Sequence, residues 1–451
     1  MMGQKVQNKQ MSMADTLGLG FMTFAFFLGA GNLIFPPLAG FLAGENMILA
    51  MIGFLITAVT LPLITLIAVA KANGKIMGLL PPVAATIFAI TIYIVIGPAF
   101  AAPRAGLVAY EMGFKPFLAD SSATFTIAGI VLNVAQLIYT LIFFGGAMLM
   151  ALNPGKLLDS VGKVLTPIMI FLLVGLAISV MVLPGSGVGQ AVGEYQTNPL
   201  TKGILEGYNT MDTLASLIFG MLIIDILRRK GVSDSKDQTK YLIRAALIAA
   251  AGLAFVYISL FYLGASAGEL ANGADNGGVI LTNYVNHEFG SLGQILLAAV
   301  VTLACLTTVI GLVTACAEFF NDLLPRISYK MFVVIMSLAC ATVANVGLSQ
   351  LISVSVPVLY TIYPVAIALV AVTFLTNKFA MPELSHRIVL SVALVFGIID
   401  GLKAAGIDMS FADFMPMHNE GMAWLLPTGL AIMACLFIKK SKAEPNTQTT
   451  S

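Results

Sequence analysis

Charged residues are scarce in this sequence. Its 451 residues include 23 lysines and arginines and 22 aspartates and glutamates, together 10% of the chain, with a formal net charge of +1. A nearly neutral chain offers no basic surface of the kind that binds nucleic acid. Hydrophobic residues make up 59% of the chain, well above the roughly 45–50% of a soluble domain. The composition therefore predicts a polytopic membrane protein surrounded by lipid.

Residues that build metal, cofactor or catalytic sites are also few. The four cysteines lie in apolar runs without metal-ligand spacing, and the three histidines lie in polar segments, so neither a metal cluster nor a cofactor is expected. No Walker sequence is present, which leaves ATP-driven transport unsupported. The string from Gly264 to Gly268, GASAG, matches a hydrolase nucleophile elbow, but it ends an apolar helix and is interpreted as a chance match or a small-residue packing face. We do not expect an enzyme.

Long apolar runs account for most of the chain. Twelve of them approach or exceed the length that crosses a hydrocarbon core of ~30 Å as a helix. The sequence thus predicts an all-α polytopic protein with twelve transmembrane helices, at residues 14–41, 46–70, 82–110, 124–152, 164–183, 203–227, 241–264, 292–320, 331–346, 352–376, 387–402 and 422–438. The polar segment 1–13 precedes them without the cleavage site of a removable signal peptide, and the polar tail 441–451 is expected to be disordered.

The basic residues predict an orientation. With a cytoplasmic N-terminus, 19 of the 23 lysines and arginines fall in cytoplasmic segments, as the excess of positive charge on that side of membranes requires. The four exceptions are Arg104, Lys115, Lys202 and Lys403. An odd number of crossings would scramble this alternation. We therefore expect both termini in the cytoplasm.

The first apolar run carries helix-breaking residues at its centre. Gly29-Ala30-Gly31-Asn32 is followed closely by Pro36-Pro37, and both glycine and proline weaken a helix interior. Backbone groups freed at mid-membrane depth cannot face lipid, so they must face protein, water or a ligand. A broken spanning helix is a candidate binding site. The alternative is a plain proline kink.

The sixth run has a similar character. It contains Gly207, the polar stretch from Asn209 to Asp212, and further small residues near Phe219. Asp212 falls well inside the predicted span, where a carboxylate is costly and usually marks a transport pathway or an ion pair. The alternative is that Asp212 caps the second half of a broken helix.

Three strings in this order resemble one known family. FFLGAGNLIFPPLAG at 26–40, GKVLTP at 162–167 and EGYNTMD at 206–212, the last followed by Leu214-Ala215 and Phe219-Gly220, are similar to those of the bacterial branched-chain amino acid:cation symporters. The resemblance implies a leucine-transporter-like fold of two inverted five-helix repeats, 14–183 and 203–376, with broken helices one and six. Two additional helices, 387–438, would lie outside this core. Broken helices at matched positions of two repeats point to a transport site.

The resemblance also implies a function and a substrate site. The expected function is secondary active import of leucine, isoleucine and valine with a cation, most readily sodium. Amides at the start of the second half-helix would meet the substrate carboxylate, exposed oxygens of helix six would meet the ammonium, and apolar walls would select aliphatic side chains. The predicted substrate-binding residues are Gly29, Ala30, Gly31, Asn32, Ala215, Ser216, Phe219 and Gly220.

Paired hydroxyls in the eighth run suggest a cation site. Thr307 and Thr308 offer oxygens to a hard monovalent cation, although threonines in spanning helices often bond back to a carbonyl of their own helix. By resemblance, the sodium ligands would be these hydroxyls and the carbonyls of Ala304, Ala25 and Leu28. The leucine-transporter fold that the chain resembles often has a second sodium site with an asparagine on helix seven. The run 241–264 contains no asparagine, so one coupling ion is expected.

Two further predictions concern charge. Arg104 near the outer end of helix three and Asp212 in helix six fall at similar depth, and opposite charges within a bundle tend to pair. They are therefore gate candidates, predicted to close above the substrate, unless Arg104 is solvated and Asp212 is a cap. A proton-coupled permease, with Asp212 or Glu318 carrying the proton, is the alternative to sodium coupling. Oligomeric state cannot be read from the sequence.

Overall fold

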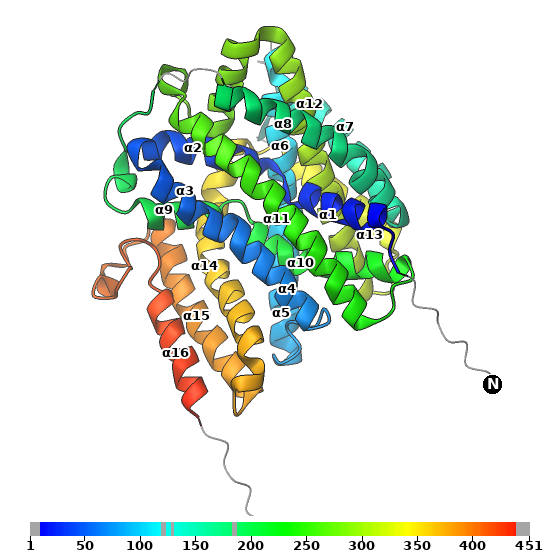
Figure 1. Cartoon of the computed structure of the whole chain (residues 1–451), viewed down its shortest axis with the longest axis vertical. Coiled ribbons are helices and arrows are strands. Elements are labelled where there is room, and N and C mark those ends of the chain that lie inside the picture. The colour runs from blue at the N-terminus through cyan, green and yellow to red at the C-terminus, as the bar shows by residue number, and fades with distance from the viewer. Residues whose placement is uncertain (1–9, 119–122, 128–129, 183–186, 439–451) are drawn as a thin grey trace, which may run out of the picture.

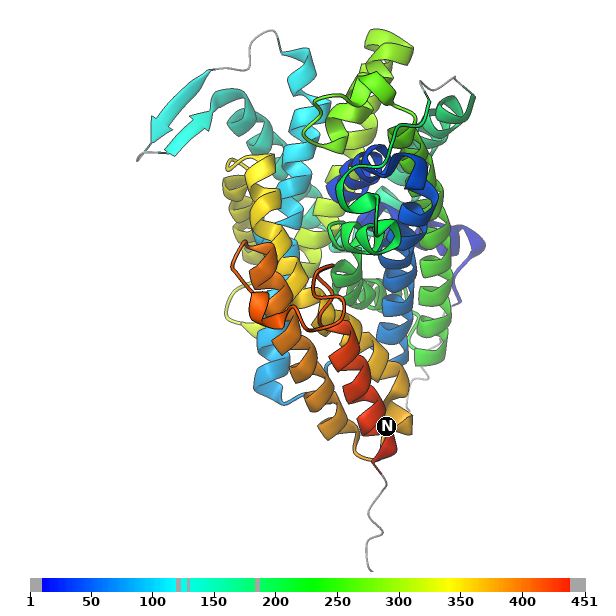
Figure 2. The ribbon, with the colours of Figure 1, turned by 90° about the vertical axis from the view of Figure 1, so that its left-hand side faces the viewer.

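The computed structural model is a helical bundle, and it describes residues 10–118, 123–127, 130–182 and 187–438 (Figures 1 and 2). Short 3-10 and π-helical turns (η) join or extend the α-helices. The elements in chain order are α1 (Met13–Phe27), α2 (Ala30–Ala43), η1 (Gly44–Asn46), α3 (Met47–Leu55), η2 (Ile56–Thr60), α4 (Leu61–Lys71), α5 (Pro82–Ile94), η3 (Val95–Ala99), α6 (Ala101–Gly113), η4 (Lys115–Phe117), β1 (Thr124–Ile127), β2 (Ile130–Asn133), α7 (Val134–Ala151), η5 (Pro154–Lys156), η6 (Leu158–Leu165), α8 (Thr166–Val182), η7 (Gly193–Tyr195), α9 (Pro199–Tyr208), α10 (Asp212–Arg229), α11 (Ser235–Ala265), η8 (Gly268–Ala271), α12 (Gly277–Leu323), α13 (Tyr329–Val343), α14 (Leu348–Leu375), η9 (Thr376–Lys378), α15 (Pro382–Ala404), η10 (Ser410–Ala412) and α16 (Leu425–Phe437).

When helices are judged by length and composition, fewer of them could cross a membrane than the sequence predicts. The described residues contain seven helical stretches long and apolar enough to cross a membrane, or eight if α9 and α10 count as one bent span. Three further apolar helices, α1, α13 and α16, are shorter than this length allows. The first predicted span contributes to this difference because a break divides it into α1 and α2. The count of twelve remains a prediction.

The fourth predicted span begins differently. The sequence indicates one apolar run over 124–152, but β1 and β2 pair as an antiparallel hairpin with Thr124 opposite Asn133, and only then does α7 begin. Alternating threonines and the β-branched residues of the second strand favour extended structure although the run is apolar. The Asn133 side chain accepts a 3.0 Å hydrogen bond from the Gln136 amide, which caps the first turn of α7. The expectation of an entirely α-helical chain is corrected here.

The eighth predicted span is extended toward its N-terminus. α12 begins at Gly277, not at the predicted residue 292, and changes direction at Gly290, whose φ is 58°. The earlier turns contain polar residues, so hydropathy alone does not detect them. Asn276 caps this helix by accepting hydrogen bonds from the amides of Gly278 and Val279.

The broken helix α1–α2 lies at the centre of the bundle. It contacts α11 and α12 on both sides of the break, while α10 contacts α1, α12 and α14. Glycines make the closest approaches possible: a Cβ on Gly264 would lie 1.9 Å from the Pro37 carbonyl oxygen, and one on Gly277 would lie 1.9 Å from that of Ile34. The packing interpretation of Gly264 is therefore confirmed. α15 and α16 lie side by side at the edge of the bundle next to α14 (Figures 1 and 2).

Candidate functional site

The first spanning segment is broken where its glycines predict. Leu28 leaves the helical conformation with a ψ of 83°, and Gly29 is extended. The side-chain oxygen of Asn32 accepts a 3.0 Å hydrogen bond from the Gly29 amide, so the polar residue after the glycines fixes the start of α2. Pro36 and Pro37 lie inside α2. The break is therefore due to the glycines and the asparagine rather than to a proline kink.

The sixth predicted segment is broken as well. α9 and α10 meet at a bend of 41°, and Met211 between them has a left-handed φ of 66°. Such a conformation costs a non-glycine residue about 1–3 kcal/mol and persists only where its surroundings enforce it. The Thr210 hydroxyl donates to the Gly207 carbonyl at 2.8 Å, and the Ser216 hydroxyl donates to the Asp212 carbonyl at 2.8 Å. Local hydroxyls thus satisfy carbonyls on both sides of this break.

The two breaks meet at one small cavity. Its volume is about 20 Å³, room for about one water molecule, so an amino acid would enter only if the walls parted. Ser216 and Gly220 do not line it: the former bonds within its helix, and a Cβ on the latter would lie 2.8 Å from a methyl group of Val69. The predicted substrate-binding residues that do line it are Gly29, Ala30, Gly31, Asn32, Ala215 and Phe219.

Aromatic rings from both breaks form one wall of the cavity. Phe26 and Phe27, at the end of α1, place their ring centroids 5.2 Å and 5.4 Å from that of Phe219 on α10. Ile96 and Leu312 extend this apolar lining. Of these five residues, only Phe219 is among the predicted site residues; the others belong to apolar runs in which nothing distinguishes a lining residue from a core residue.

Asp212 is buried and hydrogen-bonded at the cavity. Its Oδ2 accepts hydrogen bonds of 2.7 Å from the Asn32 side-chain amide and 2.7 Å from the Tyr257 hydroxyl, and the Asn32 amide also bonds to that hydroxyl. These contacts tie both breaks to α11. Tyr257 was not predicted, because the neighbouring hydroxyls of Ser259 and Tyr262 in the same apolar stretch leave nothing in the sequence that distinguishes it.

Arg104, on α6, is buried at the same cavity with an exposed fraction of 2%. Its guanidinium lies over the Phe35 ring, 5.3 Å from the centroid. Within the described part of the chain, its Nε and Nη1 have no hydrogen-bond partner, and no ion pair joins it to Asp212. The predicted gate pair is thus not formed in this conformation, because Asp212 is held by Asn32 and Tyr257 instead.

The predicted cation ligands converge between α1 and α12. The hydroxyls of Thr307 and Thr308 lie 3.1 Å and 3.2 Å from the Ala25 carbonyl oxygen, and the Thr307 hydroxyl is also 3.0 Å from that of Ala304. Leu28 follows at the end of α1, where its non-helical ψ turns its carbonyl away from the helix direction. Most of these contacts cross between helices, so simple back-bonding does not account for them. Four oxygens within hydrogen-bond distance fit a hard monovalent cation.

Ion pairs gather at the opposite end of α10 from the break. Lys163 pairs with Asp15 on α1 at 2.6 Å and with Asp159 at 2.9 Å. Arg229 pairs with Glu318 on α12 at 2.5 Å. These contacts join the starts and ends of helices that carry the breaks. Glu318 is thereby a paired residue at a helix end, remote from the cavity that Asp212 lines.

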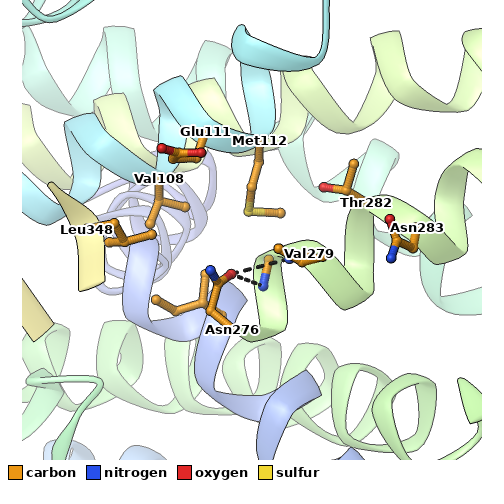
Figure 3. Close-up of a pocket in the computed structure, with 10 residues that line it drawn as sticks. Val108, Glu111, Met112, Asn276, Val279, Thr282, Asn283 and Leu348 are labelled. Atoms are coloured by element: carbon orange, nitrogen blue, oxygen red, sulfur yellow. Dashed lines mark hydrogen bonds between the residues drawn. The ribbon is translucent and has the colours of Figure 1, made fainter. Parts of the chain in front are cut away.

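A larger pocket lies further along two helices that line the cavity. Its volume is about 120 Å³, and Figure 3 shows Val108 and Met112 of α6 facing Asn276 and Val279 at the start of α12. Val108 lies one helical turn beyond Arg104 on α6. Ile34 also lines this pocket and lies one turn beyond Gly31 on α2. The pocket therefore adjoins the central cavity along α2 and α6.

The comparisons with known proteins identify the family. The family model described as "Branched-chain amino acid transport protein" matches residues 12–442. The chain belongs to this family. It is 46% identical over 437 residues to the branched-chain amino acid transport system 2 carrier protein of Pseudomonas aeruginosa, covering 96% of this chain and 97% of that one. It is 41% identical over 451 residues to the branched-chain amino acid permease BrnQ of Escherichia coli, covering 98% and 99%. The family is one of transporters, not enzymes.

Solved structures share the fold. A Na+-coupled sialic acid symporter in a substrate-bound outward-open state matches with a TM-score of 0.56 at 13% identity, covering 94% of this chain and 90% of that one. MhsT in complex with L-phenylalanine matches with a TM-score of 0.51 at 15% identity, covering 95% and 98%. At such identities the likeness concerns the fold alone, and it agrees with the predicted leucine-transporter-like architecture.

Proposed function

We propose that this chain is a secondary active transporter that imports leucine, isoleucine and valine into a bacterial cell together with sodium. The observation that carries the proposal is the buried cavity between two helix breaks, where one base and one acid face an apolar wall. A zwitterion needs both of its charges satisfied inside a low-dielectric bundle, and a broken helix supplies such groups without exposing them to lipid.

The two ends of the site suit the two charges of an amino acid. Asn32 already accepts the amide hydrogen of Gly29, and the next amides, those of Ala30 and Gly31, lie in the first turn of α2. The N-terminus of a helix favours an anion. Oxygens of the second break, near Ala215 and Asp212, suit an ammonium. The phenylalanine wall formed by Phe26, Phe27 and Phe219 would then receive an aliphatic side chain. Such a wall distinguishes one methylene by only about 1–3 kcal/mol, so all three branched-chain amino acids are expected substrates.

The coupling ion is proposed to lie between α1 and α12, beside this cavity. Thr308 lines the cavity and shares the Ala25 carbonyl with Thr307. An ion held there would bridge the end of α1 to a helix that does not break at that depth. Binding of the ion would thus stabilise the position of the Leu28–Gly29 break to which the substrate binds, and this is the physical basis for coupling.

The chain is proposed to cross the bacterial inner membrane twelve times, with both termini in the cytoplasm. Ten spans would form the two inverted repeats, and the position of α15 and α16 beside α14 suits two additional helices. Surrounding lipid and the amino acid are the expected partners, without nucleic acid or ATP. The pocket beyond Arg104 would be part of the route to the cavity from outside.

Labelled leucine uptake into proteoliposomes tests this function. We expect uptake to require an inward sodium gradient and to fall to background when choline replaces sodium at fixed pH. A matched set of vesicles with a proton gradient and no sodium tests the rival proton coupling through Asp212 or Glu318. Uptake driven equally well in choline would reject sodium as the coupling ion, and no uptake under either gradient would reject amino acid transport.

A further inference from the structure

The buried guanidinium of Arg104 is not fully hydrogen-bonded by the described residues. It lies inside the bundle, and its Nε and Nη1 make no hydrogen bond within the described part of the chain. The Phe35 ring beneath it offers a cation–π contact, which satisfies none of its donors. A buried charge is normally retained only with a partner. The partner of Arg104 is therefore expected to be a ligand that binds and dissociates.

The guanidinium also points to the first break. A Cβ placed on Gly31 would lie 2.7 Å from Arg104 Nη2, and 3.1 Å from both the Asn209 carbonyl oxygen and the Thr210 Cα. The end of the arginine thus lies beside Gly31 in the first turn of α2, where this glycine faces the backbone of the second break. Gly31 has no side chain, which leaves the guanidinium open to the cavity at that point.

The acid already present at the cavity is engaged elsewhere. Asp212 is the only carboxylate among the described residues that line it, and its Oδ2 is held by Asn32 and Tyr257. A carboxylate brought by a ligand would meet two kinds of donor at once: the planar fork of a guanidinium, which matches a carboxylate in two parallel hydrogen bonds, and the amides at the start of α2.

We propose that Arg104 binds the α-carboxylate of the transported amino acid, with Gly31 leaving the space in which the two groups meet. This inference rests on the proposed function and deepens it. It replaces a gate between Arg104 and Asp212 by a contact with the substrate itself. Ligands that keep the aliphatic side chain and the amine but lack the carboxylate should therefore lose the contribution of Arg104.

Ligand analogues test the contact directly. Purified protein in sodium would be measured for binding of labelled leucine and for its competition by leucinamide and isoamylamine, neither of which has a carboxylate. We expect the wild type to prefer leucine by about 30-fold or more, the size expected when one partner of a buried charge pair is removed. Equal affinity of the wild type for leucine and leucinamide would overturn the inference without any variant.

The variant Arg104→Gln completes the comparison. We expect its affinity for leucine to fall by about 30-fold or more and its affinity for leucinamide to stay within about threefold, so that the preference disappears. If Arg104 had only a structural role, its replacement would instead lower the affinity for both ligands equally. Arg104→Lys keeps the charge but not the planar fork of the guanidinium. Its preference for leucine over leucinamide should lie between those of the wild type and Arg104→Gln, and this variant tests the contact if Arg104→Gln does not fold. Arg387→Gln, at an exposed ion pair with Glu383, is the matched control and should bind as the wild type does.

A charge exchange separates this contact from a gate. If Arg104 and Asp212 paired with each other during transport, Arg104→Asp combined with Asp212→Arg would transport better than either single variant. A carboxylate contact predicts no recovery, and recovery would overturn it. Absence of leucine binding by the wild type would instead reject the proposed function, whereas leucine binding with an unchanged preference in Arg104→Gln rejects only the role of Arg104.

Discussion

Replacement of Gly31 by valine is expected to abolish leucine binding while leaving the protein folded in the membrane. The first added carbon would meet Arg104 Nη2 at 2.7 Å and the backbone of the second break at 3.1 Å, and a branched side chain adds two methyl groups in the same place. Overpacking of this kind usually costs about 1–3 kcal/mol in stability, which a large bundle survives. The same atoms fill the space that the substrate carboxylate would occupy.

The measurement is binding of labelled leucine to the purified variant, with monodispersity as the check of folding. Gly145→Val is a suitable control, because Gly145 also lies inside a helix but a Cβ there meets nothing within 4 Å. It should bind leucine as the wild type does. Gly31→Ala should be intermediate, since its single methyl group still meets Arg104 but the flexible guanidinium can shift. Normal leucine affinity in Gly31→Val would mean that the substrate binds elsewhere.

The first break could be predicted from the sequence because its cause is local. Two glycines separated by one residue, followed by an asparagine able to cap the next turn, are enough to end one helix and begin another. The amides of that break need a partner wherever the helix lies in the bundle. The left-handed conformation of Met211 could not be predicted in the same way, because a non-glycine residue adopts it only when tertiary contacts enforce it.

The contacts of charged residues were harder to predict. Arg104 and Asp212 do line one cavity, as their similar depth suggested. Whether they pair depends on nearby hydrogen-bond donors, and Tyr257 is contributed by α11 from a distant part of the sequence. Hydropathy likewise could not distinguish the hairpin before α7 from a helix, because β-branched residues are as apolar as the residues of a spanning helix.

Removal of both hydroxyls at Thr307 and Thr308 is expected to raise the half-saturating sodium concentration strongly. Valine has nearly the shape of threonine, so Thr307→Val with Thr308→Val changes the packing little while removing two of the four oxygens that converge near the Ala25 carbonyl. A hard cation binds through such oxygens and gains little from methyl groups. We expect an increase of about tenfold or more, since this corresponds to only ~1.4 kcal/mol of lost binding free energy.

Sodium-dependent leucine uptake at constant protein level is the measurement, with the sodium concentration varied against choline. Serine at both positions keeps the hydroxyls and should restore much of the sodium affinity, which a packing defect would not allow. Thr373→Val is the matched control, because that buried hydroxyl donates back to the Leu369 carbonyl of its own helix at 2.6 Å. If sodium dependence is unchanged in the double valine variant, the ion does not bind between α1 and α12. Sodium would then have to bind at another place in the bundle, and the proposed link between the ion and the Leu28–Gly29 break would be rejected.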